Sequence, residues 1–128
     1  MPDLHSFDYT IVRVVPRPER GECVNVGVIL YSREANFLGG IVEPDWTRIA
    51  ALDPTLDHDE IARQLQYLEN VIAGEKSAGP IAQMPASKRF HWLSGPRSTV
   101  VQVSPMHSGL TDDPEASLRR LVKTMVKV

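Results

Sequence analysis

Two groups of polar side chains have the chemistry to bind an anionic group. The first lies at a proline-rich turn and the segment after it, and it holds Arg17, Glu19, Arg20 and Asn25. Two guanidinium groups can hold a phosphate or a carboxylate through paired hydrogen bonds, with Glu19 orienting one of them. The alternative is a solvated turn, in which Glu19 pairs with an arginine and Asn25 satisfies backbone groups near a strand end.

The second group follows a Gly-Pro pair later in the chain. It consists of Arg97, Ser98, Thr99, Gln102, Ser104 and His107. On an extended chain, Ser98, Gln102 and Ser104 lie on one face. If that face meets the first turn, five cationic side chains converge on one anionic group: Arg13, Arg17, Arg20, Arg97 and His107. A nucleotide, a phosphorylated metabolite, or a carboxylate or phosphorylated side chain of a protein fits such a site. The alternative is that the prolines shape turns and the hydroxyl groups face solvent.

Catalytic and metal-binding patterns are weaker. Cys23 with His91 or His107 has the chemistry of a nucleophile and a base, but a single cysteine that opens an apolar strand is more often an inert thiol. The histidines and carboxylates show no metal-ligand spacing, and the chain has no glycine-rich phosphate loop. We therefore predict no catalytic residue, no metal and no cofactor, and a function that favours binding over catalysis.

The composition is that of an ordinary globular protein. The chain has 128 residues, of which 42% are hydrophobic, and we expect a single domain over residues 1–128. The only cysteine excludes an intramolecular disulfide. No apolar run approaches the ~18 residues that span a bilayer, and residues 1–10 lack the pattern of a secretory signal, so we expect a cytoplasmic protein. The net charge of -2 argues against nucleic-acid binding driven by bulk positive charge.

Charge is unevenly distributed along the chain. Residues 43–75 carry eight acidic side chains and two arginines, whereas residues 76–111 contain no Asp or Glu. The acid-free segment includes Lys88, Arg89, His91, Arg97 and His107. This segment is therefore locally basic and could bind an anion, unless its composition only reflects a flexible loop.

The first part of the chain predicts three strands joined by short turns. Residues 7–15 alternate between two mostly apolar faces, as expected of a central strand, and they place Arg13 among apolar neighbours. A charge is costly there without a partner. Residues 23–31 and 37–42 are the next two strands. One face of the second strand holds Val24, Val26, Val28 and Leu30. Successive strands with short turns favour an antiparallel meander.

The rest of the chain predicts three helices and more strand. Residues 44–52 fit a short helix, and Asp57 caps a longer one that ends at Gly74. Residues 75–88 are expected to form a loop, with short strands at residues 90–93 and 99–103. Asp113 and Pro114 begin the last helix. The order β-β-β-α-α-β-α predicts an α+β fold: a mostly antiparallel sheet of four to five strands with helices packed on one face.

Two long motifs carry a family resemblance. They are PRPERGECVNVGVIL at residues 16–30 and WLSGPRSTVVQVSPMHSGL at residues 92–110, the latter leading into DDP at residues 112–114. In content and order they resemble the family of small bacterial proteins catalogued as domain of unknown function 3037, over nearly the whole chain. The resemblance implies no activity, because none is established for the family. The resemblance does imply a neighbouring gene for a HipA-like kinase, since family members are often encoded near such kinases.

These observations lead to one main functional hypothesis and two alternatives. The main one is a non-enzymatic cytoplasmic accessory module that recognises an anionic group on a partner protein, with a HipA-like kinase as the partner that the resemblance suggests. The first alternative is a small-ligand protein or enzyme that binds a nucleotide or phosphorylated metabolite, with His107 as general acid or base. The second is nucleic-acid binding through the acid-free segment. A partner surface predicts a broad, flat basic patch, whereas a ligand site predicts a concave pocket.

Overall fold

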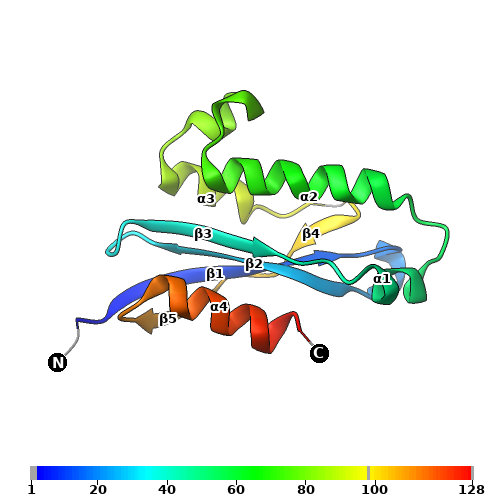
Figure 1. Cartoon of the computed structure of the whole chain (residues 1–128), viewed down its shortest axis with the longest axis horizontal. Helices are drawn as coiled ribbons and strands as arrows, with labels where there is room; N and C mark the ends of the chain where they lie inside the picture. Colours follow the sequence, from blue (N-terminus) through cyan, green and yellow to red (C-terminus); the bar gives the residue numbers. More distant parts are fainter. Residues whose placement is uncertain (1–2, 98, 128) are drawn as a thin grey trace.

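A computed structural model describes residues 3–97 and 99–127. The fold is α+β, as predicted, and its centre is an antiparallel sheet of five strands (Figure 1). The strands are β1 (His5–Val14), β2 (Val24–Ser32), β3 (Phe37–Val42), β4 (Val101–Val103) and β5 (His107–Thr111). The order is β3-β2-β1-β4, and β5 also pairs with β1. Strand β2 pairs with one edge of β1. Both β4 and β5 therefore pair with its other edge.

The first three strands form the predicted antiparallel meander. A single turn of 3-10 helix, η1 (Pro18–Arg20), lies in the β1–β2 connection, and Gly21 closes it with a φ of 75°. Glycine adopts this left-handed conformation without steric cost, which explains its place after the two prolines. The β2–β3 connection is short and contains Asn36, at a φ of 51°. Asparagine is one of the residues that tolerate this conformation best.

A β-bulge in β2 changes the predicted face pattern. Val12 of β1 pairs with Gly27, but the next residue, Arg13, pairs with Asn25, so Val26 is the extra residue. An extra residue shifts the alternation of a strand by one position. The prediction that Val24, Val26, Val28 and Leu30 share one face is therefore wrong. Val24 and Val26 belong to one hydrophobic core, and Val28 and Leu30 belong to the other.

The described part of the chain contains four α-helices. They are α1 (Trp46–Leu52), α2 (His58–Ala73), α3 (Ala86–Leu93) and α4 (Pro114–Met125). The predicted caps of α2 are confirmed: the Asp57 carboxylate accepts a hydrogen bond from the Glu60 backbone, and Gly74 ends the helix with a φ of 74°. Asp113 caps α4 in the same way, with Pro114 as its first residue. Local sequence signals thus fix where these two helices begin.

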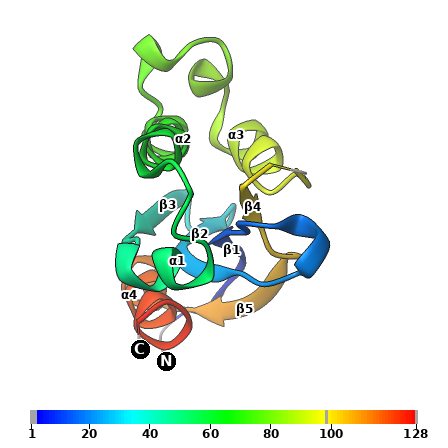
Figure 2. The same ribbon diagram turned by 90° about the vertical axis from the view of Figure 1, so that its right-hand side faces the viewer.

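The helices lie on both faces of the sheet, not on one. Helices α2 and α3 cover one face and α4 covers the opposite face (Figures 1 and 2). Each face has its own core, with Val12, Ile29 and Leu65 in the first and Val28, Leu30 and Leu118 in the second. The reason is the apolar character of both faces of β1 and β2, because a sheet that is apolar on both sides must be covered on both sides.

Two elements differ from the sequence prediction. Residues 90–93 are not a strand but the end of α3, and the preceding segment contains two short 3-10 turns, η2 (Lys76–Ala78) and η3 (Ile81–Gln83). Phe90 and Leu93 are both buried, and their spacing of three suits one face of a helix. The strand β5 was not predicted, because Ser108 and Gly109 have low strand propensity and the segment is held by its pairing with β1.

None of the helices that the structure describes is long and apolar enough to cross a membrane.

Candidate functional site

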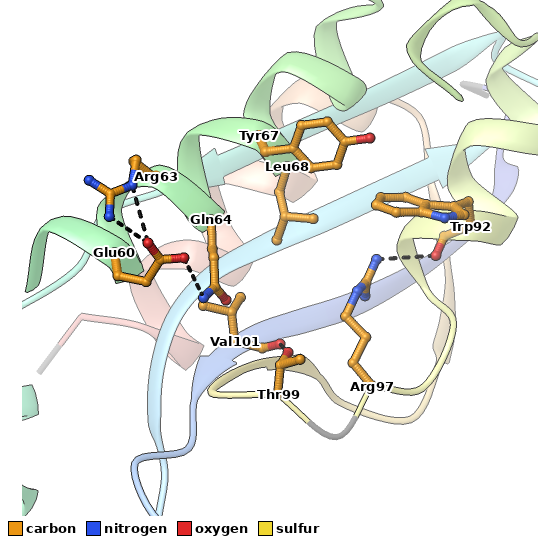
Figure 3. A pocket seen from close by; sticks show the side chains of 9 residues that line it. All are labelled: Glu60, Arg63, Gln64, Tyr67, Leu68, Trp92, Arg97, Thr99 and Val101. Atoms are coloured by element: carbon orange, nitrogen blue, oxygen red, sulfur yellow. Dashed lines mark hydrogen bonds and ion pairs between the residues drawn. The ribbon is translucent and has the colours of Figure 1, made fainter. Parts of the chain in front are cut away.

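An open groove runs between α2 and the segment that joins α3 to β4 (Figure 3). Its volume is about 450 Å³. The groove is lined by Glu60, Arg63, Gln64, Tyr67, Leu68, Trp92, Arg97, Thr99 and Val101. One wall comes from a single helix and the other from the end of α3 and the approach to β4, so tertiary packing alone creates this site.

Trp92 is the central side chain of the groove. The Tyr67 ring meets it edge-on, with ring centroids 5.8 Å apart and an interplanar angle of 84°. The guanidinium of Arg97 lies over the indole ring, 4.7 Å from its centroid. Both contacts are favourable, the first between an aromatic edge and face and the second between a cation and a π system. They hold the indole in one orientation at the surface.

The floor of the groove is apolar. Leu68 and Val101 are buried there, whereas Tyr67, next to Leu68 in α2, is 37% exposed. The apolar stripe of α2 includes Leu65 and Leu68 and faces the core, and Tyr67 lies outside it. Helix α2 therefore buries one side against the sheet and presents an aromatic side chain to the groove.

Arg97 has a structural role in the groove wall. Its Nη1 donates hydrogen bonds to the backbone oxygens of Leu93 (2.9 Å) and Gly95 (3.2 Å), and its Nη2 donates one to that of Trp92 (3.3 Å). These carbonyls lie at the end of α3, where intrahelical donors run out. Burial lowers the pKa of the Arg97 guanidinium, and the nearby Tyr67 phenol acts weakly in the opposite direction. The side chain thus ends α3 and brings a partly desolvated cation to the groove.

The α2 wall carries a charged pair. The guanidinium of Arg63 binds the carboxylate of Glu60, and Gln64 donates to the same carboxylate over 3.4 Å. Hydrogen bonds from Arg63 and then from Gln64 lower the pKa of Glu60. The charge of Arg63 is therefore balanced within the helix, unlike that of Arg97.

The first predicted group of polar side chains lies at an exposed turn. Arg17 Nε is 3.6 Å from Asp53 Oδ2, and Arg20 Nε is 2.6 Å from Glu22 Oε1. Glu19 is exposed and forms no ion pair with any residue that the structure describes. Each arginine thus has a carboxylate neighbour, although Glu19 is not the one that provides it.

Three further predicted residues meet on the face that α4 covers. Arg13 of β1 pairs with Asn25 of β2 and with Gln102 of β4. Asn25 Nδ2 donates to the backbone oxygen of Met125 (3.0 Å), and Gln102 Nε2 donates to that of Thr99 (2.7 Å). Arg13 Nε is buried and has no hydrogen-bond acceptor within residues 3–97 and 99–127. The sequence placed Arg13 among apolar neighbours, whereas its paired residues on the neighbouring strands are the polar Asn25 and Gln102.

The other predicted residues are spread over the sheet. Ser104 is buried, and its hydroxyl accepts a hydrogen bond from the Ile11 backbone N–H (2.9 Å). This bond links the segment just after β4 to β1. His107 is exposed and packs against Tyr9, with ring centroids 5.3 Å apart. Thr99 lines the groove and donates to the backbone oxygen of Val101. Ser98 lies outside the described residues.

The structure brings the two predicted groups side by side, since the Val15 N–H donates to the Val100 backbone oxygen (2.7 Å), but it does not gather the five cations at one point. Arg97 is over Trp92 on the side of the sheet that α2 and α3 cover. Arg17 and Arg20 are at the β1–β2 turn, and His107 contacts Tyr9, which packs against the α4 core. Of the two predicted groups, only Arg97 and Thr99 line the groove.

Sequence reasoning missed the aromatic part of the site. Tyr67 and Trp92 are far apart in the sequence, and only the packing of α2 beside α3 joins them. The one available signal was the position of Tyr67, a large aromatic side chain outside the apolar stripe of an amphipathic helix. In the described part of the chain, no three His, Cys, Asp or Glu side chains gather as metal ligands.

Fold and groove define a class of protein: a small α+β protein with helices on both faces of an antiparallel sheet and a groove with aromatic walls on one of them. The model of the family described as protein of unknown function (DUF3037) matches residues 9–126, so this chain belongs to that family. This confirms the resemblance of the two sequence motifs. No curated protein and no solved structure matches the chain.

Proposed function

We propose that this protein is a cytoplasmic accessory module that binds a segment of a partner protein in the groove between α2 and α3. The observation that carries the proposal is the placement of Trp92 at the surface, held between Tyr67 and Arg97. Trp, Tyr and Arg are the residues that dominate binding energy in protein interfaces. Here all three come together over an apolar floor, which suits the insertion of an apolar side chain.

The distribution of charge favours a protein segment over a free phosphate. Arg17, Arg20 and Arg63 each have a carboxylate neighbour. Arg97 donates three hydrogen bonds to backbone oxygens. A phosphate site needs several uncommitted donors around one point, and these arginines do not supply them. An apolar anchor with one charged contact is the better match to the groove.

A small ligand is the second candidate. The groove volume of about 450 Å³ is within the range of small-molecule sites, roughly 300 to 1,000 Å³. An aromatic side chain such as Trp92 can also stack on a nucleobase. Titration with ATP, GTP and their nucleosides tests this candidate, because a nucleotide site predicts shifts of the Trp92 indole signal at micromolar concentrations.

The family resemblance makes a HipA-like kinase the first partner to test. A direct approach does not depend on this choice. Random dodecapeptides displayed on phage are selected on the immobilised full chain, and the enriched peptides are titrated into ¹⁵N-labelled protein. The proposal predicts that they shift the signals of Tyr67, the Trp92 indole and Val101, which surround the groove.

Matched variants show whether the groove carries the binding. Trp92→Ala removes the central side chain, and we expect a loss of affinity of about thirtyfold, as is typical of a hot-spot residue. Trp46→Ala is the control, because Trp46 is also partly buried but stacks on His58 outside the groove. Selected peptides that bind both variants equally, or that shift only signals elsewhere, contradict the proposal.

A further inference from the structure

We infer that the groove selects a partner segment in which an Asp or Glu side chain stands close to an apolar anchor, and that Arg97 binds its carboxylate. This inference rests on the proposed function and specifies the partner chemistry of the same site. It follows from three features of the described part of the chain: Arg97 has donors without an acceptor, no carboxylate pairs with it, and an apolar surface lies next to it.

Within the described residues, the guanidinium of Arg97 has N–H donors left for a ligand. An arginine side chain carries five N–H groups in a fixed planar fork. Three of them donate to the backbone oxygens of Leu93, Gly95 and Trp92. The Nε–H and the second Nη2–H have no acceptor within residues 3–97 and 99–127. In a guanidinium, the Nε–H and the Nη2–H beside it form an edge that can bind a carboxylate through two parallel hydrogen bonds.

The charge of Arg97 has no counter-ion in the described part of the chain. No ion pair includes it, whereas Arg63 on the opposite wall is paired with Glu60. The side chain is half-buried between Trp92 and the carbonyls that end α3. A partly desolvated cation interacts more strongly with a nearby anion than an exposed one does. A carboxylate that enters the groove therefore meets an unbalanced charge at this point.

The geometry places an apolar contact beside the carboxylate. Arg97 and Trp92 face the cavity from one wall, Tyr67 faces it from α2, and Leu68 lies at the floor between them (Figure 3). A segment whose acidic side chain reaches Arg97 thus brings a neighbouring side chain over Leu68 and the exposed part of the indole. An apolar residue buries surface there, and a polar one loses its hydration.

An acidic side chain within a segment fits better than a phosphate or a terminal carboxylate. Glu60 lies on the rim of the groove and opposes a dianion more than a monoanion. Sites for terminal carboxylates use clusters of free backbone N–H groups. The α2 wall offers none, because its N–H groups are bonded within the helix or, at Glu60, to the Asp57 cap. The occupant is therefore an internal segment with an acidic side chain.

The decisive experiment changes the ligand and leaves the protein intact. The tightest peptides from the phage selection are synthesised with acetylated and amidated ends, and each acidic residue is replaced in turn by its amide, Glu by Gln or Asp by Asn. One replacement in each peptide is expected to weaken binding at least tenfold, because it removes a charged hydrogen-bonded pair. Isothermal titration calorimetry measures the affinities.

Protein variants then locate the contact. Arg97→Lys keeps a positive charge but cannot form the two-bond fork, and it should remove most of the difference between the Glu and Gln peptides. Arg20→Ala is the control, because Arg20 is an exposed arginine outside the groove and should leave that difference unchanged. The amide signals of α3 in each variant show whether the helix is still formed.

Each outcome separates the inference from the proposed function. Equal affinity of the acidic and amide peptides at the groove overturns the role of Arg97 but leaves the groove as a peptide site. Peptides that bind only with a free C-terminal carboxylate, or that inorganic phosphate displaces, overturn the choice of an internal acidic side chain. If no selected peptide shifts a groove signal, the proposed function fails and the inference fails with it.

Discussion

Arg17 and Arg20 at the β1–β2 turn differ from Arg97 in the groove in how their charges are balanced. Each turn arginine is exposed and lies beside a carboxylate, Asp53 or Glu22. Arg97 is half-buried and contacts backbone oxygens and an indole ring, with no carboxylate in the described residues. These carboxylates balance the charge of the turn arginines, although a pair that involves an exposed arginine contributes little to stability. The groove is therefore where a fixed, unbalanced cation remains available.

The largest effect on stability is expected when Arg97 is replaced. Arg97→Ala removes three hydrogen bonds to the end of α3 and the contact with Trp92, and we expect it to destabilise the protein by about 2 kcal/mol. Arg20→Ala removes one exposed ion pair and should cost about 0.5 kcal/mol or less. Urea unfolding of both variants measures these free energies. Equal losses of unfolding free energy in the two variants would contradict the difference between Arg97 and Arg20.

The same comparison shows what the sequence could predict. Features that depend on neighbours within about a dozen residues were predicted correctly, such as the Asp57 and Gly74 ends of α2 and the meander of β1 to β3. The Arg17 turn also belongs to this class, because its prolines and Gly21 define it locally. Caps and turns are set by backbone chemistry over a few residues, so the sequence is enough to locate them.

The groove depends on contacts that no local pattern contains. Tyr67 meets Trp92 only because α2 and α3 pack side by side, and Arg97 acquires its acceptors only because residues 90–93 end a helix. A window of four residues could not distinguish that helix from a strand. The bulge at Val26 is also set by pairing between strands, and it moved part of β2 to the other core. Arg97 and Thr99 were predicted as binding residues together with the Arg17 turn, whereas the groove joins them to α2.

Arg13 differs from the other arginines because one of its donors, Nε, is buried in the sheet. Its buried Nε has no acceptor in the described residues, and an unsatisfied buried donor costs about 1 to 3 kcal/mol. Methionine reaches the position of Nε with an apolar methyl group, so Arg13→Met should stabilise the protein by about 1 kcal/mol in urea unfolding. Arg48→Met is the control and should destabilise it, because Arg48 Nη1 donates to the Val126 backbone oxygen. Destabilisation by Arg13→Met would show that a partner for Arg13 exists in the folded protein.

The smallest expected effect on stability is that of Asp53, the carboxylate beside Arg17. Hydrogen bonds from the side chain and backbone of Thr55 lower its pKa below the ordinary value of 3.8, and Arg17 adds less. A carboxyl group with a lowered folded pKa contributes stability that is present above the unfolded pKa and is lost as the pH falls through the folded value.

Asp53→Asn should therefore be less stable than the natural chain at pH 7, and the difference should disappear as the pH falls below 3.8. Urea unfolding of both proteins between pH 7 and about pH 2.5 measures the difference. Thr55→Ala should reduce this pH dependence more than Arg17→Ala does, since Thr55 provides the larger effect on the carboxylate. If Arg17→Ala instead reduces the pH dependence more than Thr55→Ala, the ion pair between Arg17 and Asp53 is stronger than expected. The difference in charge balance between Arg17 and Arg97 would then be larger than the distances suggest.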